Sequence, residues 1–217
     1  FRDFLKKEGF LEVEVPVFEA TPGGAEAEPF KTRHHALDTD FYLRISLELP
    51  LKKLLVGGFE KVFEIGRIFR NEGIDREHLQ DYTQLEFYWA FHDYNDLMAL
   101  VEKMYKAVIK KVTGSLVTVC SGKKIDWGKK WQKVDYVKAF IKVNNLDPVS
   151  ASREELFAKA KELGVATERS FGKGRLIDLI FKKTVRPALI QPTFLIDPPV
   201  EIESLAKRIA GNPKQVE

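Results

Sequence analysis

The stretch KVFEIGRIFRNEGIDREHLQDYTQLEFYWAFHDY, residues 61–94, decides the fold class. Residues 61–72 and 82–91 are rich in aromatic and β-branched side chains, which favour extended structure. A polar segment that contains Gly73 and Asp75 separates them. The pattern predicts a β-hairpin with a long loop, and ordered loops longer than a turn requires are often functional.

Charged side chains on this hairpin are the candidate site. Alternation along a strand places Arg70 and Glu72 on one face of the first strand, and Glu86 and Tyr88 on one face of the second. A guanidinium suits a phosphate or carboxylate because it donates two parallel hydrogen bonds, and nearby carboxylates suit an ammonium group. From the pattern alone, a surface network of ion pairs is an equal alternative.

Outward from the hairpin, helical and extended patterns follow one another without steady alternation. The apolar spacing predicts helices over residues 1–7, 48–56, 94–113, 134–143, 152–163 and 174–184, and extended segments over 10–17, 41–46, 116–127 and 192–196. Ser152 and Glu155 match a capping box. Residues 134–190 therefore form a helical block. We predict an α+β fold in which helices flank a mostly antiparallel sheet.

Composition excludes several classes of protein. The 217 residues carry a net charge of only +3, which is less basic than a dedicated nucleic-acid binder. No apolar run reaches the ~18 residues that span a bilayer. The single Cys120 excludes an internal disulfide, and its apolar neighbours predict a buried thiol in a cytoplasmic protein. P-loop, HExxH and GxSxG motifs are absent, and Gly172-Lys173-Gly174 lacks the third glycine of a dinucleotide-binding turn.

The sequence FRNEG at residues 69–73, with His78 and Tyr82 after it, resembles motif 2 of the class II aminoacyl-tRNA synthetases. GFLEVEVPVF at residues 9–18 resembles motif 1, their dimer-forming helix and strand. Further segments narrow the resemblance to the lysyl branch, and together they cover essentially the whole chain: PGGA at 22–25, PF at 29–30, ALD at 36–38, YLRI at 42–45, residues 54–58, QPTF at 191–194 and LAK at 205–207.

The resemblance implies a homodimeric lysine–tRNA ligase. Such an enzyme activates lysine with ATP, in the presence of Mg²⁺, and transfers it from lysyl-adenylate to tRNA(Lys). On the nucleotide side, Arg70 would be the catalytic residue and would bridge the lysine carboxylate and the α-phosphate. Glu72 would meet the adenine amino group, Tyr82 would stack on the adenine, and His78 would lie near the outer phosphates.

The resemblance also implies roles on the amino-acid side of the site. The carbonyl of Gly24, together with Glu48 and Glu86, would hold the α-ammonium of lysine. Tyr88 would reach towards the ε-ammonium, while Arg70 would hold the carboxylate.

The chain departs from the family pattern at two places. Residues 79–82 read LQDY, where similar enzymes usually have Asn-Pro-Glu-Phe. The resemblance also implies that the magnesium-binding glutamates and the motif 3 arginine lie beyond Glu217, and that an anticodon-binding barrel precedes Phe1. We therefore expect residues 1–217 to be one incomplete catalytic domain, with no metal site and little activity by itself.

Two alternatives use the same catalytic fold. One is a tRNA-independent relative that attaches a lysine-type group to a translation elongation factor. The other is a non-catalytic, amino-acid-binding relative.

Overall fold

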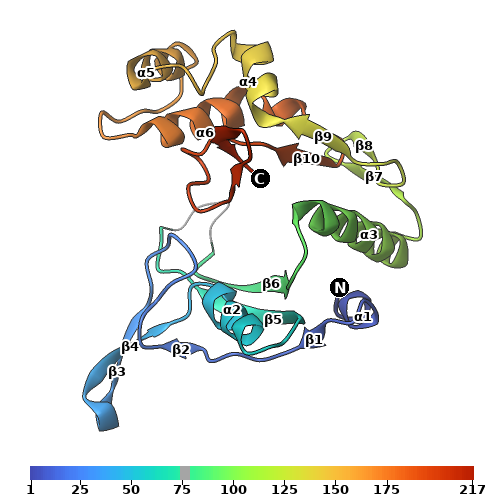
Figure 1. Cartoon of the computed structure of the whole chain (residues 1–217), viewed down its shortest axis with the longest axis vertical. Helices are drawn as coiled ribbons and strands as arrows, with labels where there is room; N and C mark the ends of the chain where they lie inside the picture. The colour runs from blue at the N-terminus through green and yellow to red at the C-terminus, as the bar shows by residue number, and fades with distance from the viewer. Residues whose placement is uncertain (74–78) are drawn as a thin grey trace. The chain divides into compact units, whose positions relative to one another are not determined.

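The predicted hairpin forms the central sheet of the first of two units, Phe1–Leu97 and Met98–Glu217 (Figure 1). The computed structural model describes residues 1–73 and 79–217. Strands β5 (Lys61–Phe69) and β6 (Asp81–Trp89) pair antiparallel along their whole length, and β1 (Leu11–Glu12) joins β5 in parallel. The hairpin prediction is confirmed.

The two faces of this sheet contact different parts of the chain. On one face, α2 (Glu48–Val56) packs Leu51 against Val62 and Ile68 of β5. On the other, Phe10 follows α1 (Arg2–Lys7) and meets the rings of Phe87 and Trp89 edge-on, with centroids 5.6 and 6.0 Å away. Alternation along β5 and β6 therefore sends one set of side chains under α2 and the other towards Phe10.

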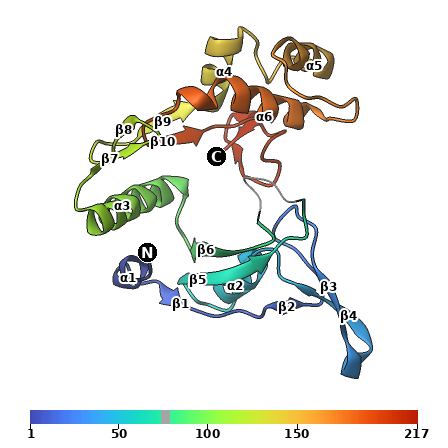
Figure 2. The same ribbon diagram turned by 180° about the vertical axis from the view of Figure 1, so that it is seen from behind.

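A small sheet of order β2–β4–β3 completes the first unit (Figure 2). It contains β2 (Phe18–Glu19), β3 (Lys31–His34) and β4 (Thr39–Leu43), with the 3₁₀ turn η1 (His35–Leu37) between β3 and β4. The extended segment predicted over residues 41–46 is shifted in the structure, where β4 runs from Thr39 to Leu43. Residues 44–47 follow it outside the strand and are buried.

The prediction of a strand over residues 10–17 is correct only for Leu11–Glu12. The backbone N–H of Val15 donates to the carboxylate of Glu64 at 2.8 Å instead of to a strand carbonyl. The Glu64 side chain thus takes the place of a backbone acceptor on a neighbouring strand, and strand pairing does not continue to Val15.

Glu64 and Arg44 form a buried ion pair that joins this segment to β5. Their side chains are 5% and 4% exposed, and Arg44 Nη2 lies 2.7 Å from Glu64 Oε1. Arg44 also donates to the carbonyls of Val15 and Arg67, both at 2.8 Å. A Cβ on Gly66 would collide with Arg44 and Glu64. The pair therefore connects three chain segments and requires glycine at position 66.

The second unit contains the helical block. The helix α3 (Tyr94–Thr113) leads from the first unit into a hairpin of β7 (Val117–Cys120) and β8 (Lys123–Asp126), followed by β9 (Gln132–Asp135). Then come α4 (Tyr136–Asn144), α5 (Arg153–Glu162), α6 (Lys173–Thr184), the 3₁₀ turn η2 (Arg186–Ala188), β10 (Thr193–Ile196), β11 (Arg208–Ile209) and β12 (Asn212–Val216). Phe140, Leu156 and Ile177, one from each of α4, α5 and α6, are fully buried in one core.

The expectation of one mostly antiparallel sheet is corrected by the strand pairing. Across the described residues, the strands form five small sheets. In one of them, β9 and β10 run parallel, with Gln132 opposite Thr193. Parallel strands need a long crossover, and here the helical block supplies it.

The prediction that the Cys120 thiol is buried is wrong, because the side chain is exposed. It ends β7 in a two-stranded ribbon where the neighbouring Val119 is 72% exposed. An apolar run in such a ribbon does not imply burial on both faces.

Among the helices of residues 1–73 and 79–217, none combines the length and apolar character of a membrane span.

Candidate active site

Glu86, near the middle of β6, is the centre of the candidate site. Its Oε1 atom accepts three hydrogen bonds, from Ser46 Oγ at 2.9 Å, the Leu47 backbone N–H at 3.1 Å and Gln84 Nε2 at 2.9 Å. Its Oε2 atom accepts one, from the Tyr88 hydroxyl at 3.0 Å. The carboxylate is therefore held rigidly between β6 and the segment that precedes α2.

Tyr88 is a neutral hydrogen-bond donor in this site. Burial raises the pKa of the Tyr88 hydroxyl, and the adjacent Glu86 carboxylate raises it further. The phenol consequently keeps its proton at neutral pH and donates it to Glu86. The Lys52 ammonium lies 5.8 Å from the centroid of the Tyr88 ring and 2.7 Å from Glu48 Oε1.

Gly24 and Glu48 border the same site. Gly24 has φ +86°, which favours glycine, and a Cβ there would stand 3.0 Å from Glu48 Cβ and 3.1 Å from the Ser46 side chain. Because α2 begins at Glu48, the backbone of Gly24 passes close to the first turn of that helix. The structure thus places Gly24, Glu48, Glu86 and Tyr88 near one another. Their predicted contacts with lysine remain predictions.

Arg70 lies just beyond β5 and contacts Ile45, which directly precedes Ser46 and Leu47. Its Nε donates to the carbonyl of Ile45 at 3.3 Å, and its guanidinium lies 5.8 Å from the centroid of the Tyr82 ring. Its backbone N–H donates to the Gln80 carbonyl at 2.8 Å. Arg70 and Tyr82, both predicted to bind ATP, are therefore neighbours.

Of the two remaining residues predicted to bind ATP, Glu72 and His78, the structure describes only Glu72. Glu72 is partly exposed and follows the end of β5 in the sequence. His78 lies outside the described residues. Their predicted roles remain predictions.

Ser46 and Gln84 are site residues that the sequence prediction missed. Gln84 could have been found, because it lies between Tyr82 and Glu86 at the spacing that puts all three on one strand face. Ser46 carries no such signal, since its contact with Glu86 joins residues forty positions apart.

The side chains that could bind a metal ion do not cluster in the described part of the chain. Over residues 1–73 and 79–217, no three histidine, cysteine, aspartate or glutamate side chains gather closely enough to hold a metal ion.

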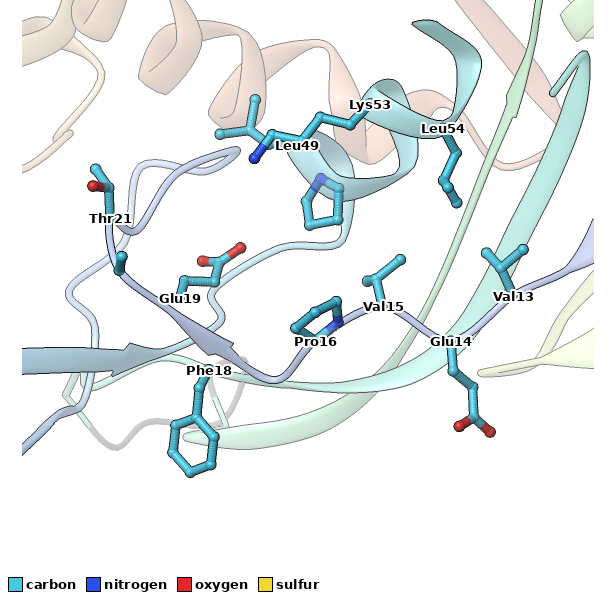
Figure 3. A pocket seen from close by; sticks show the side chains of 12 residues that line it. Val13, Glu14, Val15, Pro16, Phe18, Glu19, Thr21, Leu49, Lys53 and Leu54 are labelled. Atoms are coloured by element: carbon cyan, nitrogen blue, oxygen red, sulfur yellow. The ribbon is translucent and has the colours of Figure 1, made fainter. Parts of the chain in front are cut away.

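A groove of about 780 Å³ lies elsewhere in the first unit, between residues 13–21 and α2 (Figure 3). Its walls are largely apolar, and Val13, Val15 and Leu54 line it. Glu19 also lines it, and its Oε2 atom is buried with no hydrogen-bond partner in the described part of the chain. Burial raises the pKa of this carboxyl group, although Arg44 and Lys53 oppose the effect. The groove is not lined by the residues around Glu86.

A comparison with known families identifies the family of the chain. The family model described as tRNA synthetases class II (D, K and N) matches residues 1–217. The chain therefore belongs to the class II tRNA synthetase family.

Within this family, the chain is similar to several lysine–tRNA ligases. The lysine–tRNA ligase of Carboxydothermus hydrogenoformans is 47% identical over 218 residues, which cover 98% of this chain and 44% of that protein. The lysine–tRNA ligase of Roseiflexus castenholzii is 45% identical over 217 residues, covering 100% and 44%. That of Pectobacterium carotovorum is 43% identical over 219 residues, covering 98% and 43%. The chain thus spans less than half the length of these relatives.

Proposed function

We propose that the protein is a lysine–tRNA ligase, which activates lysine with ATP and transfers it to tRNA(Lys). One observation carries the proposal beyond similarity. Residues 45–47 touch both halves of the predicted site, because Ile45 accepts a hydrogen bond from Arg70 while Ser46 and Leu47 donate to Glu86. Arg70, the cation proposed to bind the nucleotide, and Glu86, the carboxylate proposed to bind an ammonium, are thereby hydrogen-bonded to one short segment.

The proposed first step is formation of an adenylate. The lysine carboxylate attacks the α-phosphorus of ATP, a new P–O bond forms, and the bond to pyrophosphate breaks. No protein nucleophile is needed, so positioning and charge stabilisation account for the rate. Carboxylate and phosphate repel each other as they approach, and the Arg70 guanidinium offsets this repulsion by binding both.

The remaining nucleotide contacts are proposed from the family resemblance. Tyr82 stacks on the adenine, Glu72 accepts from its amino group, and His78 lies near the outer phosphates. The Arg70 guanidinium lies close to the Tyr82 ring, which supports the proposal that both residues border one nucleotide site. Mg²⁺ is proposed as a requirement of the full-length protein.

Lysine is proposed to bind on the other side of residues 45–47. Gly24, Glu48 and Glu86 hold its α-ammonium, and Tyr88 reaches towards the ε-ammonium. Two carboxylates and a backbone carbonyl form an acceptor-rich pocket, which suits an ammonium with its three N–H donors. We also propose that the protein acts in the cytoplasm as a homodimer and that residues 1–217 belong to its catalytic domain.

Replacement of Arg70 tests this proposal in the full-length protein. We expect Arg70→Ala to reduce lysine-dependent ATP–pyrophosphate exchange by about 100-fold or more, since loss of one preorganised donor costs about 3 kcal/mol of transition-state stabilisation. Arg67→Ala is the matched control, because Arg67 is 58% exposed and pairs with Asp81. It should retain exchange near the wild-type rate.

Two results would contradict the proposal. Exchange that survives Arg70→Ala would remove Arg70 from the reaction. Binding of lysine and ATP by the wild-type protein without any exchange would instead indicate a non-catalytic binding protein.

A further inference from the structure

We propose that Gln84 is an additional substrate-binding residue, whose side-chain carbonyl accepts a hydrogen bond from the same ammonium group that Glu86 binds. The proposal rests on the function proposed above. It concerns a residue outside the sequence segments that resemble the synthetase motifs.

The orientation of the Gln84 amide follows from its neighbour. Gln84 Nε2 lies 2.9 Å from Glu86 Oε1. A carboxylate oxygen only accepts hydrogen bonds, so the amide nitrogen must face it. The opposite orientation would bring two acceptor oxygens together. The Gln84 carbonyl oxygen consequently points away from Glu86 Oε1.

That carbonyl oxygen lacks a partner in the described structure. Gln84 Oε1 is buried and accepts no hydrogen bond from residues 1–73 or 79–217. Most buried polar side-chain atoms in proteins are paired, and those that are not require an explanation. A ligand that donates a hydrogen bond would supply the missing partner.

Glu86 by itself has little capacity left for an ammonium group. Its Oε1 atom already accepts three hydrogen bonds, from Ser46, Leu47 and Gln84. Its Oε2 atom accepts one from Tyr88 and retains room for a ligand. An ammonium has three N–H donors and no acceptor, so it needs acceptors besides Oε2. The Gly24 carbonyl and Glu48 are proposed above as two of them, and an unpartnered oxygen beside Glu86 would be another.

Gln84 is placed to provide one of these acceptors. It lies two residues before Glu86 on β6, so the two side chains share a strand face, and their hydrogen bond shows that they touch. Gln84 therefore has two proposed functions in the site: its nitrogen orients Glu86, and its unpartnered oxygen accepts from the ligand.

The test measures ligand affinity in the full-length protein. Gln84→Met removes both amide atoms and keeps a side chain of similar length. By calorimetry, we expect the Kd for lysine to rise about 10- to 100-fold, the range for loss of a hydrogen bond to a charged group. The Kd for ATP should stay within about twofold if only the ammonium contact is lost. Gln132→Met, which replaces an exposed glutamine of the second unit, should leave both values unchanged.

Two lysine analogues show which group Gln84 contacts. 6-Aminohexanoate lacks the α-ammonium, and norleucine lacks the ε-ammonium. Glu86 is proposed above to bind the α-ammonium, which norleucine keeps. In competition measurements, Glu86→Gln should therefore weaken binding of norleucine and leave binding of 6-aminohexanoate unaffected. Gln84→Met should give the same pattern, because both residues are proposed to bind one ammonium.

Several outcomes would overturn the inference. It fails if Gln84→Met binds lysine as the wild type does, if both analogues are weakened equally, or if ATP and lysine are weakened alike. If circular dichroism shows that Gln84→Met does not fold, Gln84→Leu takes its place with the same expectations. A wild-type protein that does not bind lysine would overturn the proposed function as well, so the two failures are distinguishable.

Discussion

Arg44 and Glu64 show how a few buried charges determine the local structure of the first unit. Removing one partner leaves an unpaired buried charge, which is far more costly than losing an exposed ion pair. We therefore expect Arg44→Met to lower the free energy of unfolding by about 3–5 kcal/mol, measured by urea denaturation.

Two comparisons make that measurement specific. The double variant Arg44→Met/Glu64→Met should recover part of the loss, because no unpaired charge remains. Arg33→Met breaks an exposed pair with Asp40 and should cost no more than about 1 kcal/mol. Equal costs for Arg44→Met and Arg33→Met would show that the buried pair has no special role.

Glu19 is predicted to destabilise the fold at neutral pH. Burial raises the pKa of its carboxyl group above the unfolded value, so the folded state disfavours the charged form. The penalty is absent below the unfolded pKa and is complete once the pH exceeds the folded pKa. Glu19→Gln should therefore raise the Tm at pH 7, and the difference should vanish towards pH 4.

The control for Glu19 is an exposed carboxylate on the same segment. Glu14 is exposed, and its side chain extends away from Glu19 in Figure 3. Glu14→Gln should leave the Tm at pH 7 close to the wild-type value. A Glu19→Gln variant that melts earlier at pH 7 would show that the Glu19 carboxylate is stabilising.

The helix α5 begins with the capping box that the sequence predicts. Ser152 Oγ accepts from the Glu155 N–H at 3.2 Å, and the Glu155 carboxylate accepts from the Ser152 N–H at 2.7 Å. The second contact lowers the pKa of Glu155, so it contributes at neutral pH and is lost when acid protonates the carboxylate.

Ser152→Ala should lower the free energy of unfolding by about 1 kcal/mol, since one helix N–H loses its acceptor. Denaturant unfolding monitored by the helical circular dichroism signal measures the effect. Ser204→Ala changes an exposed serine outside any helix and should have no effect. Equal stability of the two variants would contradict the capping role.

Local sequence signals were sufficient for the elements with a clear period and clear ends. The helices at residues 48–56 and 94–113 have the predicted bounds, because apolar spacing defines each helix and glycine follows each end. The strand predicted over residues 10–17 failed at Val15, where a carboxylate from β5 takes the place of a backbone partner. No local pattern reports such a long-range substitution.

The whole protein is predicted to self-associate through the segment that resembles motif 1. This segment and the strand after it leave Leu11, Val17 and Phe18 49%, 37% and 57% exposed. Large apolar side chains that stay exposed can mark an interface. Phe18→Asp should therefore shift the full-length protein from dimer towards monomer in sedimentation velocity experiments.

Leu205→Asp is the matched control for self-association. Leu205 is 99% exposed in the second unit, outside the segment proposed to form the interface. Its replacement should not change the sedimentation coefficient. A wild-type protein that remains monomeric at all concentrations would contradict the dimer proposal.

The sequence by itself determined the hairpin, the helices and the resemblance to a family. These features depend on residues close together in the chain, where side-chain period, caps and short motifs carry the information. It also identified Arg70, Glu86 and Tyr88 as candidate residues, because strand alternation assigns each of them to a face.

Only the tertiary structure decided which distant residues meet. It paired β9 with β10 across the helical block, buried Arg44 against Glu64, and brought Ser46 and Gln84 to the Glu86 carboxylate. Apart from the Gln84 contact, these interactions join residues twenty or more positions apart and leave no local period. Their stability comes from burial and from satisfying polar groups, both of which depend on the folded chain as a whole.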